Sequence, residues 1–135
     1  IQYGFAAERV LKAAEAARSS GKRVAIGAAW LYKAWGRETG RIAPVEAASR
    51  DVFSFWQPLD GRFIELVVDL AQRIDAEFCS FSGTNHFYAY LDYNAETRRL
   101  EPGELIRLSD RVAEENIRKG TLSPTGEKLR QMIEP

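Results

Sequence analysis

Hydrophobic positions recur at helical spacing in four stretches of the chain. From Ala6 to Ser19 apolar residues fall three or four positions apart among Glu, Lys and Arg, and Ser-Ser-Gly follows, which predicts a helix with a defined end. A second helix is predicted over Asp60–Ile74, with Asp60 as its N-cap and a wide apolar stripe. Two further helices are predicted near the end of the chain, one over Pro102–Lys119 and a short one after Ser123.

Two short apolar segments lack helical spacing and are predicted to be strands. Val24–Ala29 is apolar throughout, which is typical of a strand buried on both faces of a parallel sheet. Glu77–Gly83 alternates bulky residues with small polar ones. The order helix, tight turn, strand therefore occurs twice, which indicates an α/β fold with parallel strands. The long connection over residues 30–58 is predicted to be functional, because loops of that length are uncommon in compact domains.

Two strands are too few for a stable parallel sheet without more strands or helices on both faces. The chain starts at Ile1 and enters a helix almost at once, so we expect residues 1–135 to be a single segment cut from a larger α/β domain. Such a fragment would expose apolar strand edges and tend to pair with another copy. The alternative is a small, self-sufficient α/β domain in which Tyr3–Phe5 or Asp51–Trp56 supplies additional strands.

The composition is that of a folded, soluble protein and excludes several classes. The 135 residues are 45% hydrophobic and 11% aromatic, enough for a core, but about half of the roughly 250 that a complete (β/α)₈ barrel takes. Nineteen basic and nineteen acidic residues cancel, which argues against a nucleic-acid partner. The single cysteine, Cys79, excludes an internal disulfide and a multi-cysteine zinc site. No apolar run approaches the roughly 20 residues of a membrane span.

Aromatic residues concentrate in the connections that follow the two predicted strands. Ligands of α/β proteins gather beyond the carboxyl ends of parallel strands, where these connections emerge. Flat rings suit the apolar face of a sugar, and neighbouring polar side chains can bond its hydroxyl groups. The residues predicted to line this sugar site are Trp30, Tyr32, Lys33, Trp35, Asn85, His86 and Tyr90. The alternative is that Trp30 and Trp35 only close the mouth of a core.

The sequence identifies no catalytic residue, metal ligand or cofactor site. His86, the only histidine, is predicted to be structural or to contact a substrate, because neither a GxSxG motif nor a nearby second metal ligand accompanies it. Glycoside hydrolysis needs two carboxyl groups across the scissile bond, and neither predicted strand ends in one. Asp60 is interpreted as a helix cap, and Asp92 as a turn residue.

The succession of Val24–Trp30, Phe53–Asp60 and Phe78–Phe81 resembles the last quarter to half of a (β/α)₈, or TIM, barrel of the glycoside-hydrolase type. The resemblance covers residues 5–118 and implies a partial barrel of about two to three αβ units with parallel strands and C-terminal helices. It also implies a carbohydrate-active function. In retaining members of that superfamily the seventh strand commonly ends in a nucleophilic glutamate, and Ala28 stands at that place here. The resemblance therefore implies sugar binding without the strand-end nucleophile.

Two other functional classes stay open. One is a non-catalytic domain whose aromatic segment over residues 30–56 binds a glycan or a protein. The other is a metal-dependent sugar isomerase or epimerase-like barrel, although neither strand end carries the carboxylate and histidine cluster that such enzymes use. In each case the expected partner is a carbohydrate or another small molecule, or a protein, rather than nucleic acid or a membrane.

Overall fold

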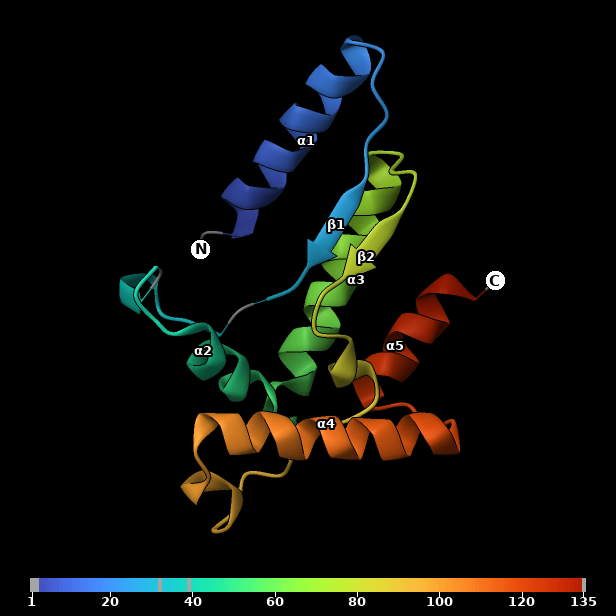
Figure 1. Cartoon of the computed structure of the whole chain (residues 1–135). Helices are drawn as coiled ribbons and strands as arrows, with labels where there is room; N and C mark the ends of the chain where they lie inside the picture. Colours follow the sequence, from blue (N-terminus) through green and yellow to red (C-terminus); the bar gives the residue numbers. More distant parts are fainter. Residues whose placement is uncertain (1–2, 32, 39, 135) are drawn as a thin grey trace. The chain divides into compact units, whose positions relative to one another are not determined.

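A computed structural model describes residues 3–31, 33–38 and 40–134 (Figure 1). Five α-helices and two short strands form in these residues, joined by loops and 3₁₀ turns. In chain order the elements are α1 Tyr3–Ser19, β1 Ile26–Ala29, α2 Pro44–Asp51, α3 Gln57–Arg73, β2 Cys79–Phe81, α4 Pro102–Lys119 and α5 Pro124–Ile133. The chain divides into two compact units, each described separately below. The first comprises residues 3–30 and 64–82, and the second comprises residues 31–63 and 83–134.

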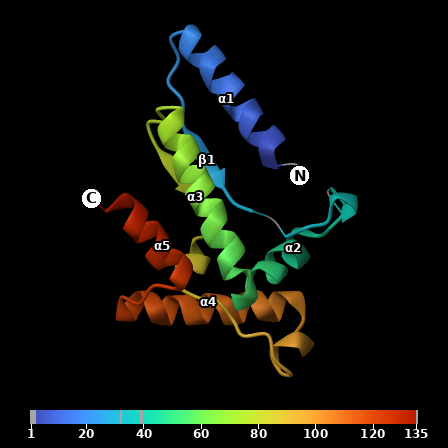
Figure 2. The same ribbon diagram turned by 180° about the vertical axis from the view of Figure 1, so that it is seen from behind.

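The first unit contains the two strands and the later part of α3. β1 and β2 run parallel, as predicted, with Ile26 opposite Cys79 and Ala29 opposite Phe81. Helix α3 lies along one side of this pair in both views (Figures 1 and 2). Ile64 and Ile74 are the most deeply buried residues of this unit, because α3 and the turn after it direct them inward.

The ladder between β1 and β2 is interrupted at Ala28. This residue has a φ of 54°, which lies in the left-handed region that a side chain disfavours. Its N–H donates to Ser80 Oγ at 3.1 Å, and its carbonyl accepts from Ser82 Oγ at 3.2 Å. Two hydroxyl groups thus replace ladder bonds where the register is irregular. Gly27 and Ala28 are exposed, so the prediction that this strand is buried on both faces is wrong.

The second unit is built mainly from helices around one hydrophobic core. The buried core residues are Val52, Phe53, Leu91 and Leu105, and Trp56, Leu100, Leu108 and Val112 pack against them. The segments at Phe53 and Leu91 form a single parallel bridge, in which Ser54 N donates to Leu91 O at 2.9 Å and Leu91 N to Val52 O at 2.7 Å. α2 packs against α4, so the core is closed by helix-on-helix contact.

Helix α2 lies inside the segment that the sequence pattern assigned to a loop. Pro44 opens it at the first helical position after an extended Ala43, which suits the fixed φ of proline. Glu46 in the first turn and Arg50 in the last turn complement the helix dipole. These local signals are present in the sequence, but eight residues give too short an apolar pattern to indicate a helix.

The predicted C-terminal helices are confirmed. α4 begins at Pro102 behind a capping box of Glu101 and Glu104, and it ends at Gly120, whose φ of 66° is the left-handed conformation of a helix stop. Ser123 caps α5, since its Oγ accepts from Gly126 N at 3.1 Å. The same hydroxyl donates to His86 O at 2.5 Å, which ties the start of α5 to the turn at residues 84–87.

The expected partial (β/α)₈ barrel is wrong. The parallel pair covers only four and three residues, and in the described part of the chain helices replace the further αβ units that a barrel requires. The segment Asp51–Trp56, considered above as an extra strand, instead ends α2, forms the single bridge at Phe53 and continues into a 3₁₀ turn. The physical reason is that residues 31–63 and 83–134 bury their apolar side chains between helices rather than against a sheet.

Among the glycines, Gly126 is the position at which an added methyl group should lower the free energy of unfolding most. A Cβ there would lie 2.1 Å from the carbonyl oxygen of Phe87, so Gly126→Ala must move backbone. We expect a loss of about 1–3 kcal/mol in the free energy of unfolding, measured by urea denaturation. Gly61→Ala, also in a helix but facing open space, is the matched control and should gain about 0.5–1 kcal/mol. Equal midpoints for Gly126→Ala and the parent chain would contradict this packing.

Candidate functional site

A lysine and two aspartates lie together inside the second unit. Lys33 Nζ donates to Asp60 Oδ1 at 2.5 Å and lies 3.4 Å from Asp51 Oδ1. The exposed fractions of the three side chains are 2%, 0% and 4%, so water does not screen these charges. Removing such groups from water is costly unless their partners are closely placed, as they are here.

Tyr90 is a second hydrogen-bond donor to Asp60, and Thr125 in turn bonds to Tyr90. Tyr90 Oη donates to Asp60 Oδ2 at 2.8 Å and lies 2.9 Å from Thr125 Oγ1. Because the single phenolic proton is directed at the carboxylate, the hydroxyl of Thr125 is the donor in the second bond. Burial raises the pKa of Tyr90 well above its usual value, so this phenol stays protonated and remains a donor.

His86 packs its ring against Tyr90. The ring centroids are 5.2 Å apart and the planes are inclined by 29°. Burial, and secondarily the positive charge of Lys33, lowers the pKa of His86 to about 4. The imidazole is therefore neutral near pH 7 and adds no charge beside Lys33.

These six residues form the buried polar cluster: Lys33, Asp51, Asp60, His86, Tyr90 and Thr125. They come from segments that are distant in the sequence, because Asp51 ends α2, Asp60 lies in the first turn of α3, and Thr125 lies in the first turn of α5. A carboxylate in a first helical turn is also favoured by the helix dipole. The Trp56 ring closes one side of the cluster, with its centroid 6.0 Å from Lys33 Nζ.

The structure brings together three of the seven residues predicted to bind sugar, namely Lys33, His86 and Tyr90. Asn85 instead donates through Nδ2 to Asp110 on α4, and Trp35 is exposed beneath the guanidinium of Arg37. Trp30 belongs to the first unit, and Tyr32 lies outside the described residues. The use of these residues as sugar contacts stays a prediction.

Sequence reasoning missed the centre of the cluster. Helix α3 begins at Gln57, so Asp60 is not the N-cap of this helix. The carboxylate of Asp60 instead accepts hydrogen bonds from Lys33 and Tyr90. Asp51 and Thr125 carried no signal at all, because an isolated Asp or Thr near a helix end is ordinary. The one signal in the sequence was Asp60 itself, an acidic residue at the start of a predicted helix, together with Lys33 among the predicted site residues.

The side chains of the buried polar cluster face one another rather than solvent. Each of its described side chains is buried or nearly so, and the bonds run from one member to another. Among the described residues, no three His, Cys, Asp or Glu side chains are placed to hold a metal ion. The chemistry of the cluster is therefore charge-assisted cross-linking of Lys33, Asp60 and Tyr90.

A second feature of the same unit is an exposed pair of aromatic rings, here called the aromatic corner: Phe55 and Tyr93. Their exposed fractions are 54% and 60%, their centroids lie 6.0 Å apart, and their planes meet at 78°. Both rings contact the buried ring of Phe53, with Phe55 stacked on it at 5.5 Å and Tyr93 edge-on at 5.1 Å. Beside them Ser54 Oγ donates to Asp92 Oδ1 at 3.2 Å. Polar groups thus lie next to an exposed apolar surface.

Comparisons with protein-family models, curated proteins and solved structures gave no match to this chain. In the described residues no helix has the length and apolar character needed to cross a bilayer.

Asp60 is the member of the buried polar cluster whose loss should destabilise the chain most. Asp60→Asn removes the carboxylate nearest to the buried Lys33 ammonium, and we expect the free energy of unfolding to fall by about 3–5 kcal/mol. Urea denaturation followed by circular dichroism measures it. Asp92→Asn, the same change at an exposed carboxylate, should stay within about 0.5 kcal/mol of the parent. A loss below about 1 kcal/mol at Asp60 would show that the cluster contributes little.

The lowered pKa of His86 predicts a pH-dependent stability. Between about pH 6.5 and 4 the unfolded chain binds a proton that the folded chain does not, so stability is complete above this range and falls as the pH drops. The slope should approach about 1.4 kcal/mol per pH unit. Because His86 is the only histidine, urea denaturation at pH 7, 6 and 5 isolates it from the carboxylates. His86→Gln should remove the slope between pH 7 and 5, and equal slopes in both proteins would refute the assignment.

Proposed function

We propose that the second unit is a carbohydrate-binding module that contacts sugar rings through the aromatic corner of Phe55 and Tyr93. The observation that carries this proposal is the pair of half-exposed rings, which come from distant segments of the chain. The planes of the two rings are nearly perpendicular to each other, and both rings pack on the buried ring of Phe53. The carbohydrate ligand is the one that the sequence led us to expect. Phe55 lies in the aromatic segment over residues 30–56 that was considered above, and Tyr93 lies outside it.

The energetic argument begins with the apolar surface that the two rings leave in water. An aromatic side chain buries roughly 150–250 Å² when it is covered, so about half of that area is available on each ring. At about 25 cal/mol per Å², covering one ring is worth roughly 2 kcal/mol to a ligand. The two rings together therefore offer roughly 150–250 Å² of contiguous aromatic surface to a ligand.

The shape of the corner favours a sugar. The C–H groups on the apolar face of a pyranose carry partial positive charge, and the face of an aromatic ring carries partial negative charge. Because the two ring planes meet at 78°, a sugar ring can stack on the face of one aromatic ring and contact the other at its side. The Ser54 hydroxyl and the Asp92 carboxylate, which already share a hydrogen bond, supply polar partners for sugar hydroxyl groups.

The corner is also rigid, which limits the entropy lost when a ligand binds. Phe53 is buried in the core, and Phe55 stacks on it with an interplanar angle of only 12°. Phe55 also contacts Trp56, whose Nε1–H donates to Arg50 O at 2.7 Å. Preorganised rings contribute to affinity because little side-chain freedom remains to be lost.

The test is isothermal titration of the 135-residue chain with defined oligosaccharides: cellohexaose, xylohexaose, mannohexaose and chitohexaose. We expect at least one to bind saturably, and Phe55→Ala and Tyr93→Ala each to weaken that binding about tenfold, the loss of roughly 1.4 kcal/mol. Phe78→Ala removes a ring of similar exposure in the first unit and is the matched control, with unchanged affinity expected. The proposal fails if none of the four sugars binds, or if binding survives both substitutions in the corner.

A further inference from the structure

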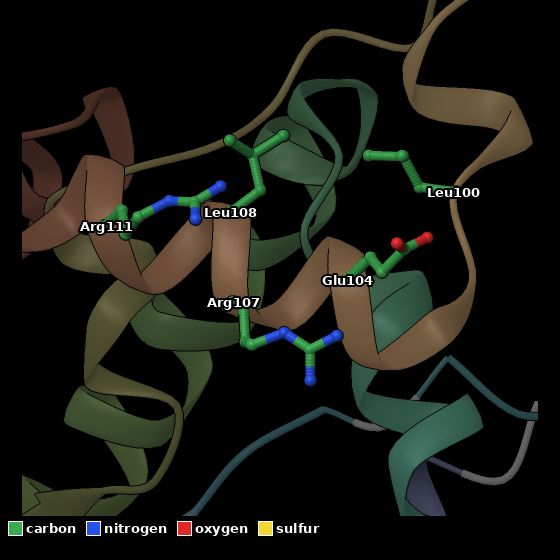
Figure 3. A pocket seen from close by; sticks show the side chains of 5 residues that line it. All are labelled: Leu100, Glu104, Arg107, Leu108 and Arg111. Carbon is green, nitrogen blue, oxygen red and sulfur yellow. The ribbon is translucent and has the colours of Figure 1, made fainter.

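A pocket of about 200 Å³ lies on α4 in the second unit, and none of its lining residues belongs to the aromatic corner. It is lined by Leu100, Glu104, Arg107, Leu108 and Arg111. Figure 3 shows four of these side chains along α4 and the fifth, Leu100, arriving from the segment before it. Positions 104, 107, 108 and 111 follow the three- and four-residue spacing of one helix face.

The pocket combines an apolar base with two cations. Leu100 and Leu108 are half-buried and pack against the hydrophobic core, so their remaining surface forms apolar lining. Arg107 and Arg111 are exposed and lie one helical turn apart, an arrangement of like charges that weakens a helix slightly. The lining of the pocket therefore places two guanidinium groups, which can bind an anion, beside the apolar side chains of two leucines.

The two arginines differ from the other cations of the C-terminal helices. Arg118 and Lys119 on α4 pair with acids one turn away, and so does Arg130 on α5. Neither Arg107 nor Arg111 forms an ion pair within the part of the chain that the structure describes.

The nearest acids on α4 are engaged elsewhere. Glu104 Oε2 accepts from the Glu101 N–H at 3.0 Å as part of the capping box. Asp110, which lies between the two arginines in the sequence, accepts from Asn85 Nδ2. With two arginines and the Glu104 carboxylate, the lining of the pocket keeps a net positive charge that a ligand can neutralise.

We propose that this pocket binds a small organic monocarboxylate with a short aliphatic chain. The carboxylate bonds the guanidinium forks of Arg107 and Arg111, whose planar donors match its two oxygens. The aliphatic chain covers Leu100 and Leu108. The volume lies below the roughly 300–1,000 Å³ of sites for larger ligands, so about ten non-hydrogen atoms fill it, and an affinity of about millimolar is expected for a ligand of that size.

The experiment is a titration of the isotopically labelled chain with hexanoate, followed by the amide resonances of α4 in two-dimensional NMR spectra. We expect saturable shifts centred on residues 100–111 with a millimolar Kd, and weaker binding at higher ionic strength. The uncharged hexanamide, which keeps the chain but not the charge, should bind at least about fivefold more weakly. Equal affinity for hexanoate and hexanamide would overturn the role of the arginines.

A double variant and a single control variant locate the binding site. Arg107→Gln and Arg111→Gln together should raise the Kd for hexanoate at least about fivefold, since both charged hydrogen bonds are lost. Arg118→Gln makes the same change of charge on the same helix, at a residue already paired with Glu114, and should leave the Kd unchanged. All three positions are exposed, so the variants should fold like the parent. Absence of saturable shifts, or an equal effect of Arg118→Gln, would refute the proposal.

Discussion

The contact between the Lys33 ammonium and the Asp60 carboxylate is the interaction on which the second unit depends. Burial of these charges is favourable only when their partners are in place, because a buried ion that loses its partner keeps the whole desolvation cost. Tyr90 donates to Asp60 and Thr125 in turn bonds to Tyr90, so the loop after β1 and the starts of α3 and α5 must meet in one arrangement. The buried polar cluster thus specifies which segments come together, whereas the hydrophobic core around Phe53 supplies the area that they bury.

The segment from Asp51 to Asp60 connects this interior to the surface. Its two aspartates face inward to Lys33, and Phe55 between them faces solvent. Trp56 lies between the two environments, with its ring near Lys33 and its indole N–H bonded to Arg50 O. Because both ends of this segment are held by buried charges, the ring of Phe55 is held as well. The orientation of the aromatic corner, and with it the proposed sugar contact, therefore depends on the buried polar cluster.

The errors of the sequence analysis have a common physical origin. The repeated order of helix and strand was real, and the two strands are parallel, but that order does not determine how many strands a domain contains. The sequence pattern places residues 44–56 in a long loop, with a strand over Asp51–Trp56 as the alternative, and they form α2 and a 3₁₀ turn because α4 offers an apolar face to pack against. Asp60 was interpreted as a cap because helix starts often carry an aspartate, and only its partners show that it is the centre of a network.

The sequence by itself determined the elements whose signals are local. The spacing of apolar residues, the capping box at Glu101, the left-handed Gly120 and the cap at Ser123 place α4 and α5 without knowledge of any other segment. The tertiary structure alone decided that Asp60 meets Lys33 and Tyr90, and that Phe55 meets Tyr93. Helix signals act over three or four residues and can be read along the chain, whereas a buried ion pair joins residues 27 positions apart and exists only once the intervening chain has folded.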